Sequence, residues 1–102
     1  MSKYTLSYLP IAKQDLAEII DYIQNNLQNP IAAKNTLSKI ENAILERLES
    51  PESFAIWQSK KKRPYPYRRI NVGNYTVWYV VIDKVMEIRR ILYSHRNEEN
   101  LI

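Results

Sequence analysis

The sequence contains no cysteine, one glycine and one histidine. Without cysteine, a disulfide framework and thiolate chemistry are excluded, and a reducing compartment is suitable. The scarcity of typical transition-metal ligands leads us to expect no metal and no cofactor. No apolar run approaches the roughly 20 residues of a membrane span, and the first residues do not resemble a signal peptide. We therefore expect a cytoplasmic protein with no membrane partner.

Acidic residues are missing from a long central stretch, between Glu52 and Asp83. Residues 1–52 carry five Lys/Arg and seven Asp/Glu, whereas residues 53–102 carry ten and four. The net charge of +4 is therefore concentrated in the second half, most of all in "KKKRPYPYRRI" at 60–70. A basic half on a small domain predicts an anionic partner, either a nucleic acid or an acidic protein segment. Charge alone leaves both open.

What is present is a globular composition, with 45% apolar residues in 102 positions, and it predicts a single domain over residues 1–102. "YTLSYL" at 4–9 is typical of a short strand, and Pro10 either ends it or begins a helix. Apolar residues then recur at helical spacing up to "QNNLQNP" at 24–30, and acidic residues near the front, such as Asp15, suit the helix macrodipole. Asn29 is a suitable N-cap for a second helix, which we expect to end at Ser50-Pro51.

The second half is rich in Val, Ile, Tyr and Trp over residues 67–73, 74–83 and 85–94. The breaks between these segments are short, which predicts tight hairpins and an antiparallel meander. Residues 75–82 are apolar on both faces except for Thr76, as expected of a central strand. The predicted fold class is α+β: an N-terminal antiparallel helical hairpin packed on one face of a three- to four-stranded, mainly antiparallel sheet. We expect the other face, carrying Arg and Tyr, to be bare and functional.

Four segments in this order and spacing, "DLAEIIDYIQNN", "NPIAAKNTLSKI", "PYRRINVGNYTVWYVV" and "IRRILYSHRNEENLI", resemble the RelE/ParE toxin superfamily of bacterial type II toxin–antitoxin modules. The resemblance covers nearly the whole chain and implies the same α+β fold and a cognate antitoxin partner. Two branches share the fold. RelE-like members cleave mRNA in the ribosomal A site, whereas ParE-like members inhibit DNA gyrase without cutting RNA.

Metal-free RNA cleavage requires proton transfer and stabilisation of the phosphate charge. The resemblance implies that Arg96 and Arg69 stabilise the phosphate and that His95 is the general acid, with Tyr93 as a weaker candidate. Because neighbouring side chains of a strand point to opposite faces, only one of Arg68 and Arg69 can lie at the site. We expect the other to pair with helix carboxylates.

A second group of residues is expected to bind nucleic acid or a protein partner because it is basic or, in the case of tyrosine, suited to stacking on bases. Its members are Lys60, Lys61, Lys62, Arg63, Tyr65, Arg68 and Arg90. By the same strand alternation, one of Arg89 and Arg90 is expected to be structural.

The predicted function is that of a toxin that arrests growth by ribosome-dependent mRNA cleavage as a metal-independent endoribonuclease, with the ribosome and mRNA as partners. The basic second half and the Arg/His ending favour this branch. Inhibition of DNA gyrase without nuclease activity is the alternative. It is favoured by Thr76, which stands where RelE-like nucleases usually have arginine, and by the absence of their C-terminal tyrosine.

Overall fold

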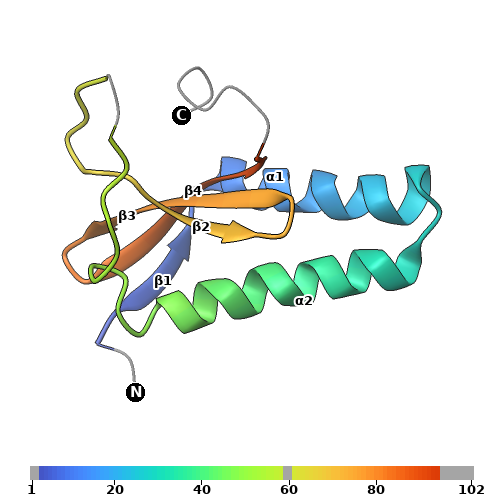
Figure 1. Cartoon of the computed structure of the whole chain (residues 1–102), viewed down its shortest axis with the longest axis horizontal. Coiled ribbons are helices and arrows are strands. Elements are labelled where there is room, and N and C mark those ends of the chain that lie inside the picture. The colour runs from blue at the N-terminus through green and yellow to red at the C-terminus, as the bar shows by residue number, and fades with distance from the viewer. Residues whose placement is uncertain (1–2, 59–60, 95–102) are drawn as a thin grey trace.

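The computed structural model describes residues 3–58 and 61–94. Their elements are β1 (Thr5–Tyr8), α1 (Pro10–Asp21), the π-helical η1 (Tyr22–Asn26), α2 (Pro30–Arg47), β2 (Arg68–Val72), β3 (Tyr75–Ile82) and β4 (Val85–Tyr93). The ribbon separates into a pair of helices and a small twisted sheet (Figure 1). This arrangement confirms the predicted α+β class.

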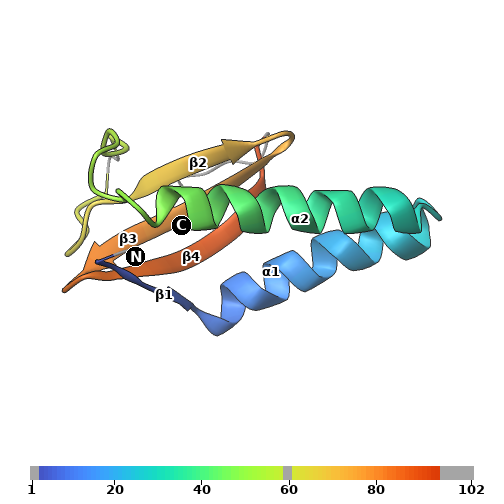
Figure 2. The same ribbon diagram turned by 90° about the horizontal axis from the view of Figure 1, so that it is seen from below.

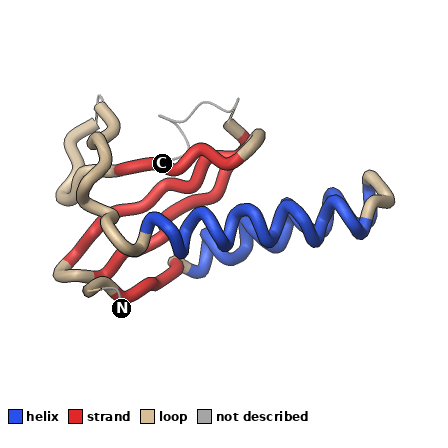
Figure 3. Tube along the Cα trace, turned by 60° about the horizontal axis from the view of Figure 1, so that its bottom comes forward, coloured by secondary structure: helices blue, strands red, loops and turns tan. Residues whose placement is uncertain are grey.

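Both helices begin with a proline in the first turn, where the missing N–H costs no hydrogen bond. Asn29 caps α2 as expected, since its Oδ1 accepts a hydrogen bond from the Ala32 N–H at 3.0 Å. The first helix ends in the π-helical turn η1 rather than in a regular α-turn. The two helices run antiparallel side by side and extend well beyond the sheet (Figures 2 and 3).

The sheet has four strands in the order β1-β4-β3-β2. As predicted, β2, β3 and β4 form an antiparallel meander with β3 inside it. The β3–β4 hairpin turns at Asp83 and Lys84, which both have positive φ, as a tight hairpin turn requires. The first strand pairs with β4 in parallel, from Thr5 opposite Val85 to Tyr8 opposite Ile88. The earliest segment of the chain thus lies beside the last strand.

The main core lies between α1, α2 and one face of the sheet. It is built from the buried residues Ala12, Ile40, Ile44, Ile70, Val77, Tyr79, Met86, Ile88 and Ile91. Burying these apolar side chains supplies the principal driving force for folding, at roughly 25 cal/mol for each Å² removed from water.

The second face of the sheet is not bare, so that expectation is wrong. Thr76, Trp78 and Val80 alternate with the core residues of β3 and are only 2%, 0% and 0% exposed. The Trp57 ring packs edge-on against Trp78 with 4.7 Å between ring centroids. The segment that carries Trp57, between α2 and β2, rises beside the sheet on the side away from α2 (Figure 1). The Trp57 ring therefore fills part of the surface that we expected to be open.

Within the described ranges, no helix has the length and hydropathy that a membrane crossing requires.

Candidate functional site

On the second face Arg63 and Arg69 lie near the rings of Trp57 and Trp78, and Lys61 and Lys62 directly precede Arg63 in the chain. We call Lys61, Lys62, Arg63 and Arg69 the basic surface. The Arg63 guanidinium carbon lies 4.8 Å from the Tyr67 ring centroid and 5.8 Å from that of Trp57. The corresponding carbon of Arg69 lies 5.7 Å from the Trp78 centroid. Cation–π attraction of about 0.5–2 kcal/mol for each pair holds these arginines against the rings while Lys61 and Lys62 stay exposed.

A pocket of about 230 Å³ opens within this surface. Its walls come from the segment before β2 and from the second face of the sheet: Lys62, Arg63, Pro64, Tyr65, Tyr67, Val80 and Arg89. The Arg89 Nε lies 2.6 Å from Glu87 Oε1, so part of its charge is neutralised. Tyr65 is 40% exposed at the rim. The pocket therefore brings predicted partner-binding residues, Lys62, Arg63 and Tyr65, together beside aromatic rings, and their role stays a prediction.

Arg68 points to the opposite face and holds the chain itself. Its Nε donates to the Phe54 carbonyl oxygen at 2.9 Å, and an Nη atom lies 3.5 Å from the Glu52 carbonyl oxygen. The expectation that Arg68 pairs with helix carboxylates is therefore wrong. Its partners are main-chain oxygens of the segment after α2, so Arg68 anchors the start of the segment that covers the second face.

Arg90 is engaged in an ion pair that fastens α1 to β4. Its guanidinium donates to both carboxylate oxygens of Asp15, at 2.7 and 2.9 Å, and the Ile91 N–H donates to the same carboxylate at 3.0 Å. In the pairing of β3 with β4, Trp78 lies opposite Arg90 and Tyr79 lies opposite Ile88, so Arg89 is an extra residue in β4. Such a bulge breaks the alternation of the strand. The hydrogen bonds that Arg90 donates to the Asp15 carboxylate raise the pKa of Arg90 above its ordinary value.

Asp15 was expected to serve the helix macrodipole, but it is 8% exposed and outside the first turn of α1. Its role is to bind Arg90 and to satisfy the N–H of Ile91, where β4 extends beyond β1. Arg90 is thus the structural member of the Arg89–Arg90 pair.

Tyr93 and Arg69, two of the predicted catalytic residues, are not brought together. Tyr93 pairs with Tyr75 across β3 and β4, and their rings meet edge-on at 6.0 Å on the α1 side of the sheet. Burial, reinforced by the neighbouring Tyr93, raises the pKa of Tyr75. Arg69 lies opposite Trp78, three residue pairs away along β3 and on the other face. A single substrate atom cannot contact both side chains.

The remaining predicted residues divide into two groups. His95 and Arg96, predicted to be catalytic, and Lys60, predicted to bind a partner, lie outside the described residues. Thr76 is buried, and its hydroxyl lies 2.9 Å from Ser94 Oγ and 3.3 Å from Asn71 Oδ1. Where RelE-like nucleases usually have an arginine, this chain therefore has the small Thr76 hydroxyl, which is hydrogen-bonded to its neighbours. Within residues 3–58 and 61–94, no three His, Cys, Asp or Glu side chains cluster as metal ligands would.

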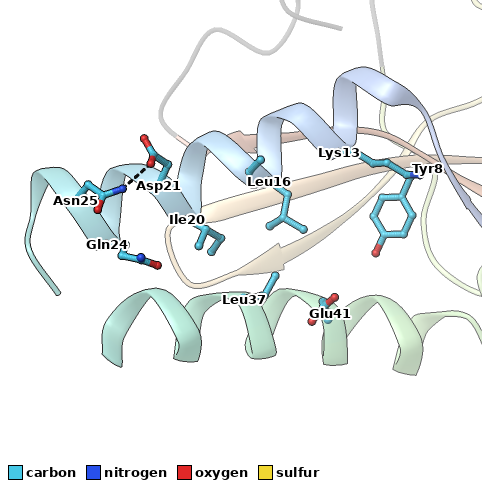
Figure 4. A pocket seen from close by; sticks show the side chains of 10 residues that line it. Tyr8, Lys13, Leu16, Ile20, Asp21, Gln24, Asn25, Leu37 and Glu41 are labelled. Atoms are coloured by element: carbon cyan, nitrogen blue, oxygen red, sulfur yellow. Dashed lines mark hydrogen bonds between the residues drawn. The ribbon is translucent and has the colours of Figure 1, made fainter. Parts of the chain in front are cut away.

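A larger groove, of about 590 Å³, lies between the two helices (Figure 4). Leu16 and Ile20 of α1 point toward Leu37 of α2, and polar side chains lie around them: Lys13, Asp21, Gln24, Asn25 and Glu41. Asn25 donates to Asp21 at 2.6 Å. The groove is lined mainly by apolar surface, with the polar side chains at its edge.

Two residues important to this arrangement were missed by sequence reasoning. Trp57 covers the second face, and its signal was a run of apolar residues, Phe54, Ile56 and Trp57, in a segment with neither helical nor strand periodicity. Asp15 gave no comparable signal, because an acidic residue on a helix is ordinary and its partner lies 75 positions away.

Comparison with known proteins gives a consistent result. A family model described as the ParE toxin of the type II toxin–antitoxin system, parDE, matches residues 6–98. No curated protein sequence matches the chain. Among solved structures, the chromosomal ParDE TA system from P. aeruginosa superposes with a TM-score of 0.73 at 19% identity, over 89% of this chain and 96% of that chain. The YoeB dimer from Staphylococcus aureus superposes with a TM-score of 0.53 at 21% identity, over 90% and 98%.

Proposed function

Because the chain belongs to the ParE toxin family of type II toxin–antitoxin systems, we propose that it arrests growth by binding and inhibiting DNA gyrase rather than by cutting RNA. Gyrase is the target that the ParE branch of the family implies. The observation that supports binding over catalysis is the separation of Arg69 from Tyr93 on opposite faces of the sheet. The buried Thr76 in place of an arginine supports the same conclusion.

The test compares two activities of the purified protein. We expect it to inhibit supercoiling by gyrase and to leave mRNA intact in a translating extract. Cleavage of mRNA within codons, without any effect on supercoiling, would overturn the proposal. Toxicity that persists in an Arg69→Ala variant would further separate this toxin from a nuclease, because removing a phosphate-binding arginine from such an enzyme causes a large loss of rate.

Ribosome-dependent mRNA cleavage remains the second candidate because of the basic surface. The sequence between Glu52 and Asp83, which carries Lys61, Lys62 and Arg63, contains no acidic residue, and such a basic stretch is typical of a surface that contacts a phosphate backbone. On this hypothesis, the Arg69→Ala variant keeps its fold but loses toxicity. Cells that express it should also lack the cut transcripts that the wild-type protein produces.

We also propose that the cognate antitoxin neutralises the toxin through an acidic segment that crosses the basic surface. Charge complementarity of this kind mainly accelerates association. A Lys61→Glu/Lys62→Glu variant should bind the antitoxin with an association rate reduced about tenfold or more at low salt, and the difference should shrink as salt is added.

The matched control is Lys34→Glu/Lys39→Glu, which makes the same charge change at exposed positions of α2. Equal association rates for the two variants would show that only net charge matters and that the basic surface is not the docking site.

A further inference from the structure

A cleft on the α1 side of the sheet is lined by three tyrosine rings and two carboxylates. Its walls come from one side of α1, from the tip of the helical hairpin and from the ends of β3 and β4: Asp15, Glu18, Ile19, Tyr22, Leu27, Tyr75, Ile91, Leu92 and Tyr93. We call it the tyrosine cleft. Its volume is about 580 Å³, large enough for one long side chain and its neighbours. No function described above uses it.

The aromatic and apolar lining of the tyrosine cleft is exposed. Tyr22, Leu27 and Tyr93 are 53%, 56% and 44% exposed. Contiguous exposed apolar groups of this kind mark protein interaction sites, and tyrosine is among the residues that contribute most to such interfaces. The ring of Tyr75 is partly buried beneath them, and the neighbouring phenols of Tyr93 and Tyr22 both contribute to its raised pKa. The three rings therefore belong to one cluster.

The charge of the tyrosine cleft is negative. Asp15 is matched by Arg90, which binds it from the strand side. Glu18 accepts a hydrogen bond from Gln14 at 3.1 Å, and its charge also acts on Arg90, whose pKa it helps to raise. No lysine or arginine lines the cleft, and the single charge of Arg90 behind the two carboxylates leaves a net negative charge that attracts a further cation. The chemistry is opposite to that of the basic surface on the other face.

Three aromatic rings beside a carboxylate are suited to a cation that is also planar. The face of an aromatic ring attracts cations, and a guanidinium stacks on such a face while it donates two hydrogen bonds to a carboxylate. A lysine ammonium gains less because it is compact and strongly hydrated. We propose that the tyrosine cleft binds an arginine side chain presented by the toxin's protein target, an inference that rests on the proposed function for the identity of that target.

The direct test uses a blocked Arg-Arg dipeptide as the probe and follows tyrosine ring signals by NMR. We expect shifts at Tyr22, Tyr75 and Tyr93 that are lost in a Glu18→Gln variant. A dipeptide of citrulline, which has nearly the same shape without the charge, should cause no comparable shifts. Equal shifts with citrulline, shifts centred on Tyr65 and Tyr67, or no shifts at all would overturn the proposal.

The second test measures binding to gyrase and inhibition of supercoiling. We expect Tyr22→Ala and Glu18→Gln to weaken both by about 10- to 30-fold, the loss typical of an interface residue that carries binding energy. The matched controls on α2 are Leu45→Ala, which removes an apolar side chain that is 54% exposed, and Glu46→Gln, which removes one negative charge. Both should behave like the wild-type protein.

The outcomes separate the two proposals. If the wild-type protein does not inhibit gyrase, the proposed function fails while the dipeptide measurement still decides the chemistry of the tyrosine cleft. If Tyr22→Ala and Glu18→Gln inhibit gyrase fully, or if Tyr22→Ala instead dissociates a dimer of the toxin in sedimentation, the cleft is not the docking site for the target. Antitoxin binding should be unchanged in both variants, which also verifies that they fold.

Discussion

Replacing Asp15 with alanine should destabilise the protein, because the Asp15 carboxylate joins α1 to β4. The Asp15 carboxylate accepts two hydrogen bonds from Arg90 and one from the Ile91 N–H. Its removal leaves a guanidinium whose side chain is 20% exposed and a buried N–H without a partner. Breaking a buried ion pair from one side costs about 3–5 kcal/mol. Because water still reaches part of Arg90, we expect a loss near the lower limit, about 3 kcal/mol.

Urea denaturation followed by circular dichroism measures this loss directly as a change in the free energy of unfolding. In a thermal scan it corresponds to a decrease in Tm of roughly 12–24 °C for a domain of about 100 residues. The double variant Asp15→Ala/Arg90→Met should lose less than the sum of the single variants, because the second change removes the stranded charge.

The control is Glu87→Ala, which breaks another ion pair of β4. The Glu87 and Arg89 side chains are 21% and 27% exposed, against 9% for Asp15, so water screens this pair more and we expect a smaller loss than for Asp15→Ala. The reasoning would be refuted if Asp15→Ala cost no more than Glu87→Ala, because the carboxylate would then contribute nothing beyond an ordinary surface pair.

Three further predictions concern the second face and the buried tyrosine. Trp57→Ala should shift the fluorescence of Trp78, the one remaining tryptophan, to longer wavelength, because its cover is removed; an unchanged spectrum would contradict this packing. Tyr79→Phe should cost about 1–2 kcal/mol in urea denaturation, since its hydroxyl donates to the Pro51 carbonyl at 2.8 Å. Burial raises the pKa of Tyr79 above 10.0. The neutral hydroxyl therefore stabilises the folded state fully below pH 10, and this stabilisation is lost as the pH rises through the pKa of the folded protein. The free energy of unfolding of the Tyr79→Phe variant should accordingly decline less at high pH than that of the wild-type protein. Thr76→Arg should destabilise the protein by several kcal/mol without creating nuclease activity, because it places a charge in a buried position; a stable variant that cleaves mRNA would refute this.

Most of the local structure could be predicted because neighbouring residues encode it. The spacing of apolar residues along α1 and α2, the Asn29-Pro30 helix start and the turns at Gly73 and Asp83 all act within a few positions. Each reflects a backbone preference or a repeat of 3.6 or 2 residues. The strand boundaries followed to within two residues for the same reason.

The candidate site was less predictable because it depends on contacts between distant residues. Strand alternation correctly separated Arg68 from Arg69, but the bulge at Arg89 could not be foreseen, since an inserted residue leaves no mark in the apolar pattern. The partner of Arg90 lies on α1. The segment around Trp57 has no regular period, so its position over Trp78 is determined only when the sheet has formed.

The sequence by itself determined most of the secondary structure, the α+β class, the basic second half and the RelE/ParE superfamily, within which the family model then selected the ParE toxins. Only the tertiary structure decided which faces are open: it buried Trp78, turned Tyr93 away from Arg69 and assembled the tyrosine cleft from three separate segments. The physical reason is the range of the interactions. Periodicity and turn preferences act between neighbours, whereas the burial of a face depends on which remote segment removes it from water.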